Sequence, residues 1–297
     1  MRPLPHPDAS SALPRHGLIA VRGDDARAFL HNQLTNDIEH LEPGGARFAG
    51  WCSPKGRLLA SFVAMAMPDG ILLQLARELA PAIAKRLGMF VLRAKARVVD
   101  ESDAWHQYGT WGAGAAARLA AAGLPVPSGT WASAAAEGAC VVALGDERYL
   151  VVSRLARPAL ADGGTPEDWA LAEIRDARPF ITQATQDQFV PQMANLELVG
   201  GVDFKKGCYP GQEIVARTQY RGILKRRMYR VEADEPLADG QPLVSDDFPD
   251  QASGMVVNAV GGEGLAVLQI ASVEQAQPVR LRAGGPALRV SRPPYAL

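Results

Sequence analysis

The chain has 297 residues, 47% apolar and 21% charged, which is more than one hydrophobic core usually supports, so we expect two or three domains. A net charge of −1 and a pI near 6.5 exclude a global field that attracts nucleic acid or acidic membranes, so any anion site must be local. The sequence has neither a secretory signal nor a transmembrane run. Its three cysteines form no CxxC, and their spacing argues against a disulfide framework. Together these observations predict a reduced cytoplasmic setting.

The first hundred residues predict a mixed α+β arrangement. Apolar patterning predicts strands over 17–23, 57–67, 70–76 and 91–101 and helices over 24–34 and 78–90. Asp24 is the expected N-cap of the first helix. The order strand, strand, helix, strand from residue 57 onward is half of a ferredoxin-like domain.

Two weak signals lie in the next part of the chain. Arg93, Lys95 and Arg97 alternate along the strand expected over 91–101, and we interpret them as a solvated strand face rather than an anion site. Residues 111–124 contain a formal GxGxxA, but a dinucleotide site also needs a preceding strand and an acidic residue about 20 positions later. An Ala-rich helix that begins at a glycine explains the same residues.

The second half divides into three stretches. Residues 141–155 predict another hairpin, and the Pro/Gly/Asp-rich residues 156–168 predict a connection. The dense motifs lie between Trp169 and Arg221. Beyond residue 226, short apolar runs separated by turn residues predict a small all-β barrel or sandwich.

The stretch FKKGCYPGQEIVAR, residues 204–217, has the composition of a ligand-binding turn. Cations beside Cys208 would favour its thiolate, which is the nucleophilic and metal-binding form. Glycines permit a tight turn and close approach to a ligand. Tyr209 offers a flat ring, and Gln212 and Glu213 offer paired hydrogen bonds to a pterin-like edge. The alternative, from residue types alone, is a small buried cysteine in a turn.

Cations are concentrated around and after this stretch. Residues 205–230 hold a single acid, Glu213, and the following cations: Lys205, Lys206, Arg217, Arg221, Lys225, Arg226, Arg227 and Arg230. The cluster suits phosphates or a polyanionic tail, and a solvated loop and strand edge is the alternative.

Residues 189–217 resemble the signature of the YgfZ family, folate-binding relatives of the glycine-cleavage T-protein (aminomethyltransferase). The core K-G-C-Y-x-G-Q-E is complete from Lys206 to Glu213. FLHNQLTNDI (29–38) and CSPKGRLLA (52–60) are similar to two further family blocks, in the same order. The resemblance covers nearly the whole chain.

The resemblance implies an α+β fold, a three-domain aminomethyltransferase-like architecture with a ferredoxin-like part and a C-terminal small β-barrel around a central folate channel. It implies a discontinuous folate-binding domain of residues 1–48 and 156–222, a ferredoxin-like domain of residues 49–155 and a barrel of residues 223–297.

The resemblance also implies tetrahydrofolate, or a one-carbon derivative, as cofactor. It implies iron–sulfur client enzymes as partners, tRNA indirectly through them, and no membrane or resident metal. Cys208 and Lys206 are the expected reactive pair. The residues expected to bind folate are Trp169, Gly207, Tyr209, Gly211, Gln212, Glu213 and Arg221.

Two departures from the family pattern bear on activity. His16 stands where some members place a second tryptophan. The T-protein glutamate that holds the pterin corresponds to Arg175, which argues against aminomethyl transfer and favours an accessory factor. A tetrahydrofolate-dependent aminomethyltransferase and a non-enzymatic RNA- or protein-binding module stay open as alternatives.

Overall fold

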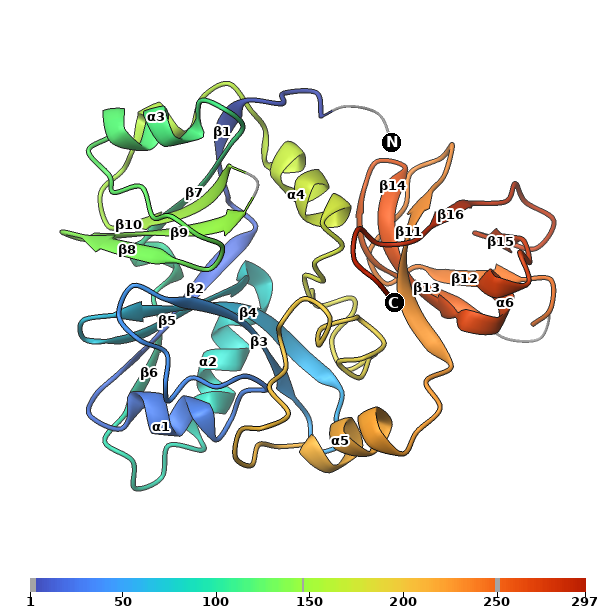
Figure 1. Ribbon diagram of the computed structural model, residues 1–297, viewed down its shortest axis with the longest axis horizontal. Helices are drawn as coiled ribbons and strands as arrows, with labels where there is room; N and C mark the ends of the chain where they lie inside the picture. The colour runs from blue at the N-terminus through green and yellow to red at the C-terminus, as the bar shows by residue number, and fades with distance from the viewer. Residues whose placement is uncertain (1–3, 146, 249–251) are drawn as a thin grey trace. The chain divides into compact units, whose positions relative to one another are not determined.

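The computed structural model describes residues 4–145, 147–248 and 252–297, and these form two compact units (Figure 1). The first unit comprises the chain up to Ala49 together with Phe62–Trp169. The second comprises Gly50–Ser61 and Ala170–Leu297. No helix in the described part of the chain is long and apolar enough to cross a membrane.

The first five-stranded sheet has the order β3-β4-β5-β2-β6, and β2 pairs antiparallel with both β5 and β6. Helix α2 packs against β2 and β6, and α1 contacts β5. The elements are β2 (His16–Arg22), α1 (Ala26–His31), β3 (Ala46–Cys52), β4 (Leu58–Met67), β5 (Gly70–Ala76), α2 (Ala80–Gly88) and β6 (Arg97–Asp100). The boundary between the two units falls within β3 and β4.

The second five-stranded sheet has the order β1-β7-β10-β9-β8 and belongs to the first unit. Its elements are β1 (Ala9–Ala12), β7 (His106–Trp111), α3 (Ala115–Ala121), β8 (Ser133–Ala136), β9 (Ala139–Gly145) and β10 (Arg148–Ser153). Tyr108, Val141 and Val151 of the sheet and Leu119 of α3 are buried in one core cluster. Short 3₁₀ helices lie at Arg77–Leu79, Ser102–Ala104 and Pro158–Leu160, and α4 spans Pro166–Arg175.

A six-stranded sheet of order β15-β12-β13-β14-β11-β16 curls into a nearly closed barrel in the second unit. Its elements are β11 (Arg226–Glu232), β12 (Pro242–Ser245), β13 (Gly254–Val260), β14 (Glu263–Gln269), α6 (Ile270–Glu274), β15 (Val279–Arg280) and β16 (Arg289–Ser291). Tyr229, Leu243, Val256 and Leu268 are buried in its core. Helix α5 (Gln212–Tyr220) precedes the barrel in the chain.

Most predicted elements are confirmed. The hairpins expected over 57–76 and 141–155 are β4–β5 and β9–β10. The GxGxxA segment forms α3, with Gly114 as its N-cap, as the Ala-rich reading predicts. The α+β class and the C-terminal barrel are confirmed as well. The three domain boundaries stay a prediction.

Two local predictions are wrong. The strand expected over 91–101 covers only Arg97–Asp100, so Arg93 and Lys95 lie in a turn rather than on a strand face. The N-cap of α1 is Asp25, not Asp24, and the Asp25 carboxylate accepts a hydrogen bond from the Lys95 backbone N–H at 2.7 Å instead of capping the helix. A tertiary contact therefore replaces the local cap that the sequence pattern favours.

Gly109 allows the largest side chain of α4 to lie directly on β7. A Cβ at this position would stand 2.1 Å from Cε3 of Trp169, far inside normal contact. The Trp169 ring is 1% exposed, lies 6.2 Å from the Trp111 ring and has the Arg148 guanidinium 5.2 Å from its centroid. The strand thus requires glycine because the indole takes the place of a side chain.

We predict that Gly109→Ala lowers the free energy of unfolding by about 3 kcal/mol, the upper end of the cost of overpacking, because neither strand nor indole can move freely. Denaturant unfolding followed by tryptophan fluorescence measures the loss. Gly88→Ala is the control, since its Cβ would meet nothing within 4 Å at the end of α2, and it should be neutral or slightly stabilising. Equal stability of the two variants would contradict this account of Gly109.

Candidate functional site

The KGCYPGQE motif forms an exposed turn that leads into α5. We call residues 204–211 the motif turn. Gly211 is the N-cap of α5 and has φ +79°, a left-handed conformation that favours glycine. Its carbonyl accepts the backbone N–H groups of Ile214 at 3.2 Å and Val215 at 3.3 Å, which starts the helix. Gly211 thereby sets the direction in which the chain leaves the motif turn.

A second turn from a distant part of the sequence holds Gly211 in place. This support turn, residues 53–57, is closed by the Ser53 N–H, which donates to the Arg57 carbonyl at 2.8 Å. A Cβ on Gly211 would lie 2.4 Å from the Ser53 carbonyl oxygen and 2.7 Å from Cα of Gly56. A Cβ on Gly56 would lie 2.8 Å from Cβ of Ile214. The two turns interlock because each has a glycine where they touch.

Asp187 connects the support turn to the rest of the second unit. Its carboxylate accepts the Ser53 hydroxyl at 2.9 Å, and its carbonyl accepts the Arg57 guanidinium at 3.2 Å. The backbone N–H of Asp187 donates to the Leu58 carbonyl at 2.8 Å. In the sequence, residues 52–60 stand out only by their similarity to a family block. The signal that it missed was the pair of glycines, one in each block.

Cys208 is exposed on the motif turn, between a half-buried lysine and a buried tyrosine. The Lys206 ammonium lies 4.8 Å from the centroid of the Tyr209 ring, a cation–π contact, and also donates to the Gly207 carbonyl at 3.3 Å. Tyr209 is 8% exposed, and its burial raises its pKa. The tyrosine anchors the turn, and the cysteine faces solvent.

The other two cysteines have the opposite environment. Cys52 and Cys140 are both buried. Burial raises the pKa of each thiol to about 12, so both are neutral thiols at pH 7. Cys208 is therefore the cysteine that a solvent-borne partner can reach.

Three further predicted residues lie on α5: Gln212 and Glu213 in its first turn and Arg221 at its end. Gln212 is half-buried, and Glu213 and Arg221 are exposed. The structure, over the residues it describes, records no hydrogen bond or ion pair for these three side chains, so their polar groups are available to a ligand. The structure brings together the predicted residues Lys206 to Glu213, whereas Trp169 belongs to the first unit.

A buried polar network attaches the segment before the motif turn to the barrel. The Asn195 amide donates to the Met228 carbonyl at 2.8 Å, and the Gln192 amide donates to the Val215 carbonyl of α5 at 2.8 Å. Arg227 is ion-paired with Glu197, and burial raises the pKa of Glu197 despite that pairing. Arg227, one of the clustered cations, therefore has a structural role.

Arg175 forms a two-pronged ion pair with Glu263 of β14. Its Nη2 and Nε lie 3.0 and 3.2 Å from the two carboxylate oxygens, and both side chains are largely buried. The Arg175 guanidinium is thus held by the barrel.

Trp169 presents one unsatisfied polar atom. Its Nε1 is buried and has no hydrogen-bond acceptor among the residues that the structure describes. An unpaired buried N–H costs about 1–3 kcal/mol, which makes it a candidate contact for a ligand oxygen or nitrogen. Gly109 and Arg148 cover the ring. The N–H edge is therefore a better contact for a ligand than the ring faces.

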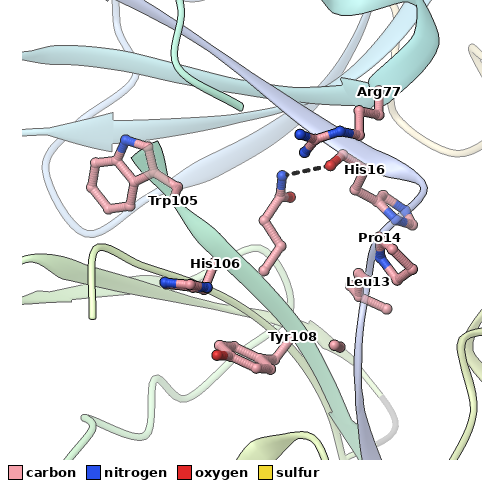
Figure 2. Close-up of a pocket in the computed structure, with 9 residues that line it drawn as sticks. Leu13, Pro14, His16, Arg77, Trp105, His106 and Tyr108 are labelled. Atoms are coloured by element: carbon pink, nitrogen blue, oxygen red, sulfur yellow. Dashed lines mark hydrogen bonds between the residues drawn. The ribbon is translucent and has the colours of Figure 1, made fainter. Parts of the chain in front are cut away.

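The first unit also contains a cavity of about 180 Å³ (Figure 2). Its lining residues are Ala12, Leu13, Pro14, His16, Arg77, Trp105, His106, Gln107 and Tyr108. Figure 2 shows Trp105 and His106 on one side and His16 and Arg77 on the other. Pockets for drug-sized ligands usually exceed about 300 Å³, so this cavity does not hold a whole folate.

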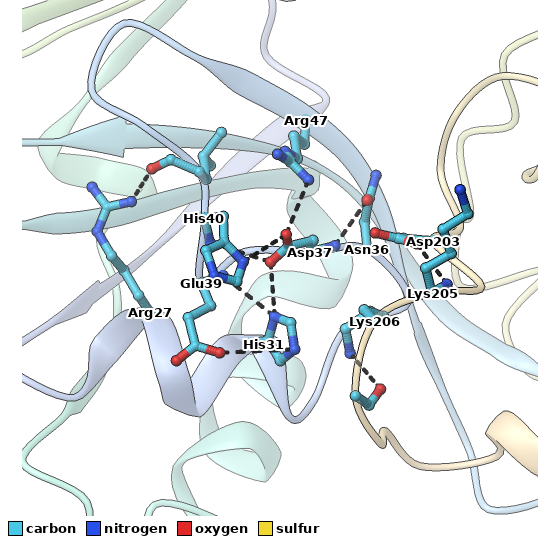
Figure 3. A network of polar contacts seen from close by, with 12 residues as sticks. Arg27, His31, Asn36, Asp37, Glu39, His40, Arg47, Asp203, Lys205 and Lys206 are labelled. Atoms are coloured by element: carbon cyan, nitrogen blue, oxygen red, sulfur yellow. Dashed lines mark hydrogen bonds and ion pairs between the residues drawn. The ribbon is translucent and has the colours of Figure 1, made fainter.

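Asp37, in the family block at residues 29–38, is the centre of a network of polar contacts (Figure 3). Asp37 lies 2.9 Å from Nδ1 of both His31 and His40 and 3.8 Å from Arg47. Partial burial disfavours its charge, but hydrogen bonds from the backbone and ring of His40 and from His31 hold the pKa of Asp37 below its usual value. In the described parts of the chain, no group of three or more His, Cys, Asp or Glu is placed to hold a metal ion.

Comparison with solved structures identifies the fold. The chain is similar to the crystal structure of glycine cleavage system aminomethyltransferase T from Bartonella henselae, with a TM-score of 0.78 and 17% identity over 97% of this chain and 86% of that chain. Residues 225–296 match the family described as CAF17, C-terminal beta-barrel domain. The protein therefore has the aminomethyltransferase T fold with a CAF17-type barrel.

Sequence comparison identifies the family. The chain is 31% identical to the tRNA-modifying protein YgfZ of Vibrio vulnificus (strain YJ016) over 273 residues, 84% of this chain and 83% of that protein. It is 32% identical to the tRNA-modifying protein YgfZ of Edwardsiella ictaluri, over 77% of this chain and 72% of that protein. This chain belongs to the YgfZ family, as the motif predicted.

We predict that Gly211→Ala lowers the free energy of unfolding by more than the strain of a left-handed alanine explains. A left-handed alanine costs about 1–2 kcal/mol, and its overlap with the support turn adds about 1–3 kcal/mol. Urea unfolding measures the total loss.

Gly200→Ala is the matched control, since Gly200 has φ +75° and a Cβ there would meet nothing within 4 Å. In this variant the free energy of unfolding should fall only by the cost of a left-handed alanine. Equal losses in the two variants would show that the interlock of the turns adds no constraint.

Proposed function

We propose that this protein is a tetrahydrofolate-binding accessory factor in tRNA modification. Its finer role is to support the assembly or repair of iron–sulfur clusters in enzymes such as those that thiolate tRNA. The similarity to YgfZ proteins named as tRNA-modifying, together with the aminomethyltransferase T fold, supports the coarser part of this proposal. The exposed Cys208 on an interlocked turn is the observation that carries the finer part.

Cys208 has the position that a transient iron ligand needs. Its thiol would lose a proton to solvent, and the sulfur would then coordinate an iron of the client's cluster. Coordination changes the oxidation state of neither iron nor sulfur. One cysteine cannot hold a cluster alone, so the other ligands come from the client or from a small thiol. The interlocked turns keep the sulfur in place.

The residues available to a folate are polar groups without partners. The buried Nε1 of Trp169 fits a ligand acceptor, and Gln212 and Glu213 fit the donors and acceptors of a pterin edge. Arg221 is an exposed cation suited to the glutamate tail. Tetrahydrofolate, when bound, supplies a carrier for one-carbon groups. The chain's own contribution is to bind and orient it.

The first alternative is a tetrahydrofolate-dependent aminomethyltransferase. The pairing of Arg175 with Glu263 argues against it, because a guanidinium stands where the T-protein has the carboxylate that holds the pterin. A turnover assay with a methylamine-loaded lipoyl carrier separates the two: formation of methylenetetrahydrofolate would favour the enzyme. A non-enzymatic RNA- or protein-binding module is the second alternative, and the exposed cations of α5 favour it.

We predict that Cys208→Ala abolishes rescue of cells that lack their own family member. The readout is the content of thiolated tRNA nucleosides, which reports an iron–sulfur thiolating enzyme, at equal abundance of each variant. Lys205→Ala is the control, because Lys205 is an exposed neighbour on the same turn, and it should rescue like the unsubstituted protein.

Each result of the rescue experiment has a separate meaning. Failure of Cys208→Ala alone supports a functional thiol. Equal rescue by both variants makes Cys208 dispensable and sinks its proposed role as iron ligand. Failure of the unsubstituted protein contradicts the iron–sulfur role as a whole.

We also predict that tetrahydrofolate changes the tryptophan fluorescence and that Trp169→Phe weakens its binding about tenfold. The factor corresponds to the loss of one hydrogen bond of about 1.4 kcal/mol. Isothermal titration calorimetry measures the Kd without relying on fluorescence. Trp131→Phe is the control and should leave the Kd unchanged. Absence of any tetrahydrofolate binding would refute the cofactor proposal.

A further inference from the structure

Helix α5 and the segment after it expose apolar and cationic side chains together. We define the α5 surface as Ile214, Arg217, Tyr220, Arg221, Ile223 and Lys225. Ile214, Tyr220 and Ile223 are 40%, 70% and 89% exposed, respectively. Val215 is fully buried, so the helix packs on the side of Val215 and presents Ile214, Arg217 and Arg221 to solvent at helical spacing. Figure 1 shows α5 leading through this segment into β11.

The cations of this surface differ from many other arginines of the protein. Those arginines are paired with carboxylates, for example Arg22 with Glu101 and Arg280 with Asp246. Arg217, Arg221 and Lys225 form no ion pair within the described residues, and their side chains are exposed. Their charge is therefore not neutralised by the protein itself, although the net charge of the chain is −1.

Tyr220 lies between Arg217 and Arg221 in the sequence and adds an exposed aromatic ring. It makes a T-shaped contact with Phe204, with the ring centroids 5.9 Å apart and the planes at 71°. This contact orients the tyrosine but leaves 70% of the residue exposed. An oriented and exposed aromatic ring among cations is the arrangement by which proteins stack a nucleobase while binding the adjacent phosphates.

We propose that the α5 surface binds single-stranded RNA directly, with phosphates on Arg217, Arg221 and Lys225 and a base stacked on Tyr220. Ile214 and Ile223 then provide apolar contact at the sides. A protein partner would need a carboxylate opposite each cation, whereas an RNA strand carries one negative charge per nucleotide along its whole length. This surface does not include Cys208 and requires no folate. It shares Arg221 with the residues proposed for the folate tail, so the test changes Arg217 and Lys225 instead.

The test uses the full chain and a fluorescein-labelled oligouridine of 12 nucleotides, with anisotropy measured between 50 and 200 mM KCl. Three phosphate contacts on a single strand predict a slope of log K against log salt concentration of about −2. Arg217→Glu with Lys225→Glu should weaken binding at least tenfold and bring the slope close to −0.7. Tyr220→Ala should weaken binding about tenfold at every salt concentration and leave the slope unchanged, because stacking involves no counterions.

Lys85→Glu with Arg93→Glu is the matched control. These two cations are also exposed, without an ion pair within the described residues, but they lie on α2 and in the turn after it. The double variant changes the net charge by the same amount and should keep the Kd within twofold. Tetrahydrofolate binding, measured by calorimetry, should stay unchanged in Arg217→Glu with Lys225→Glu, which separates this proposal from the folate proposal.

Three outcomes would overturn the proposal. The first is an equal loss of affinity in the α5 double variant and in the control double variant. That result would show that the binding depends on net charge alone. The second is unchanged RNA binding in Tyr220→Ala, which would show that no base stacks on this ring. The third is no RNA binding by the unsubstituted protein at 50 mM KCl, alone or together with failed cellular rescue by the Arg217 and Lys225 variant. That combination would assign the surface to a protein partner instead.

Discussion

The contact between Gly211 and the support turn is the constraint on which the arrangement of the candidate site depends. Two chain segments about 155 positions apart approach so closely that neither accommodates a Cβ at the point of contact. Asp187 holds one side through Ser53 and Arg57, and the start of α5 holds the other. Because both sides are backbone, the position of the motif turn depends little on side-chain rotamers. That rigidity suits the role proposed for Cys208, which is to present one sulfur atom.

The polar groups around this contact divide into satisfied and available ones. Arg175 with Glu263 and Arg227 with Glu197 are partly or wholly buried ion pairs that attach the preceding segments to the barrel. Ion pairs of this kind contribute more to a defined geometry than to net stability, because desolvation offsets much of their attraction. The exposed cations of α5 have no such partners within the described chain. The protein thus uses part of its cationic cluster to build the site and leaves part of it for solvent-borne partners.

Local patterns predicted most of the fold because each depends on neighbouring residues. The hairpins β4–β5 and β9–β10 follow from apolar runs around turn residues, and α3 follows from an alanine-rich run after Gly114. The predictions that failed involve distant partners. Residues 91–96 do not form a strand, since the Asp25 backbone and carboxylate bind Lys95 and hold the chain in a turn. Alternation of charge along the sequence carries no information about that contact.

The sequence by itself determined the family, through an unbroken KGCYPGQE motif, and it singled out Cys208 as the cysteine with a distinctive neighbourhood. The tertiary structure decided that Cys52 and Cys140 are buried while Cys208 is exposed, and that eight clustered cations have different roles. It also decided why Gly56 and Gly211 are glycines. Burial, ion pairing and steric approach are relations between residues far apart in the chain, and residue types and spacings do not specify them until the chain is folded.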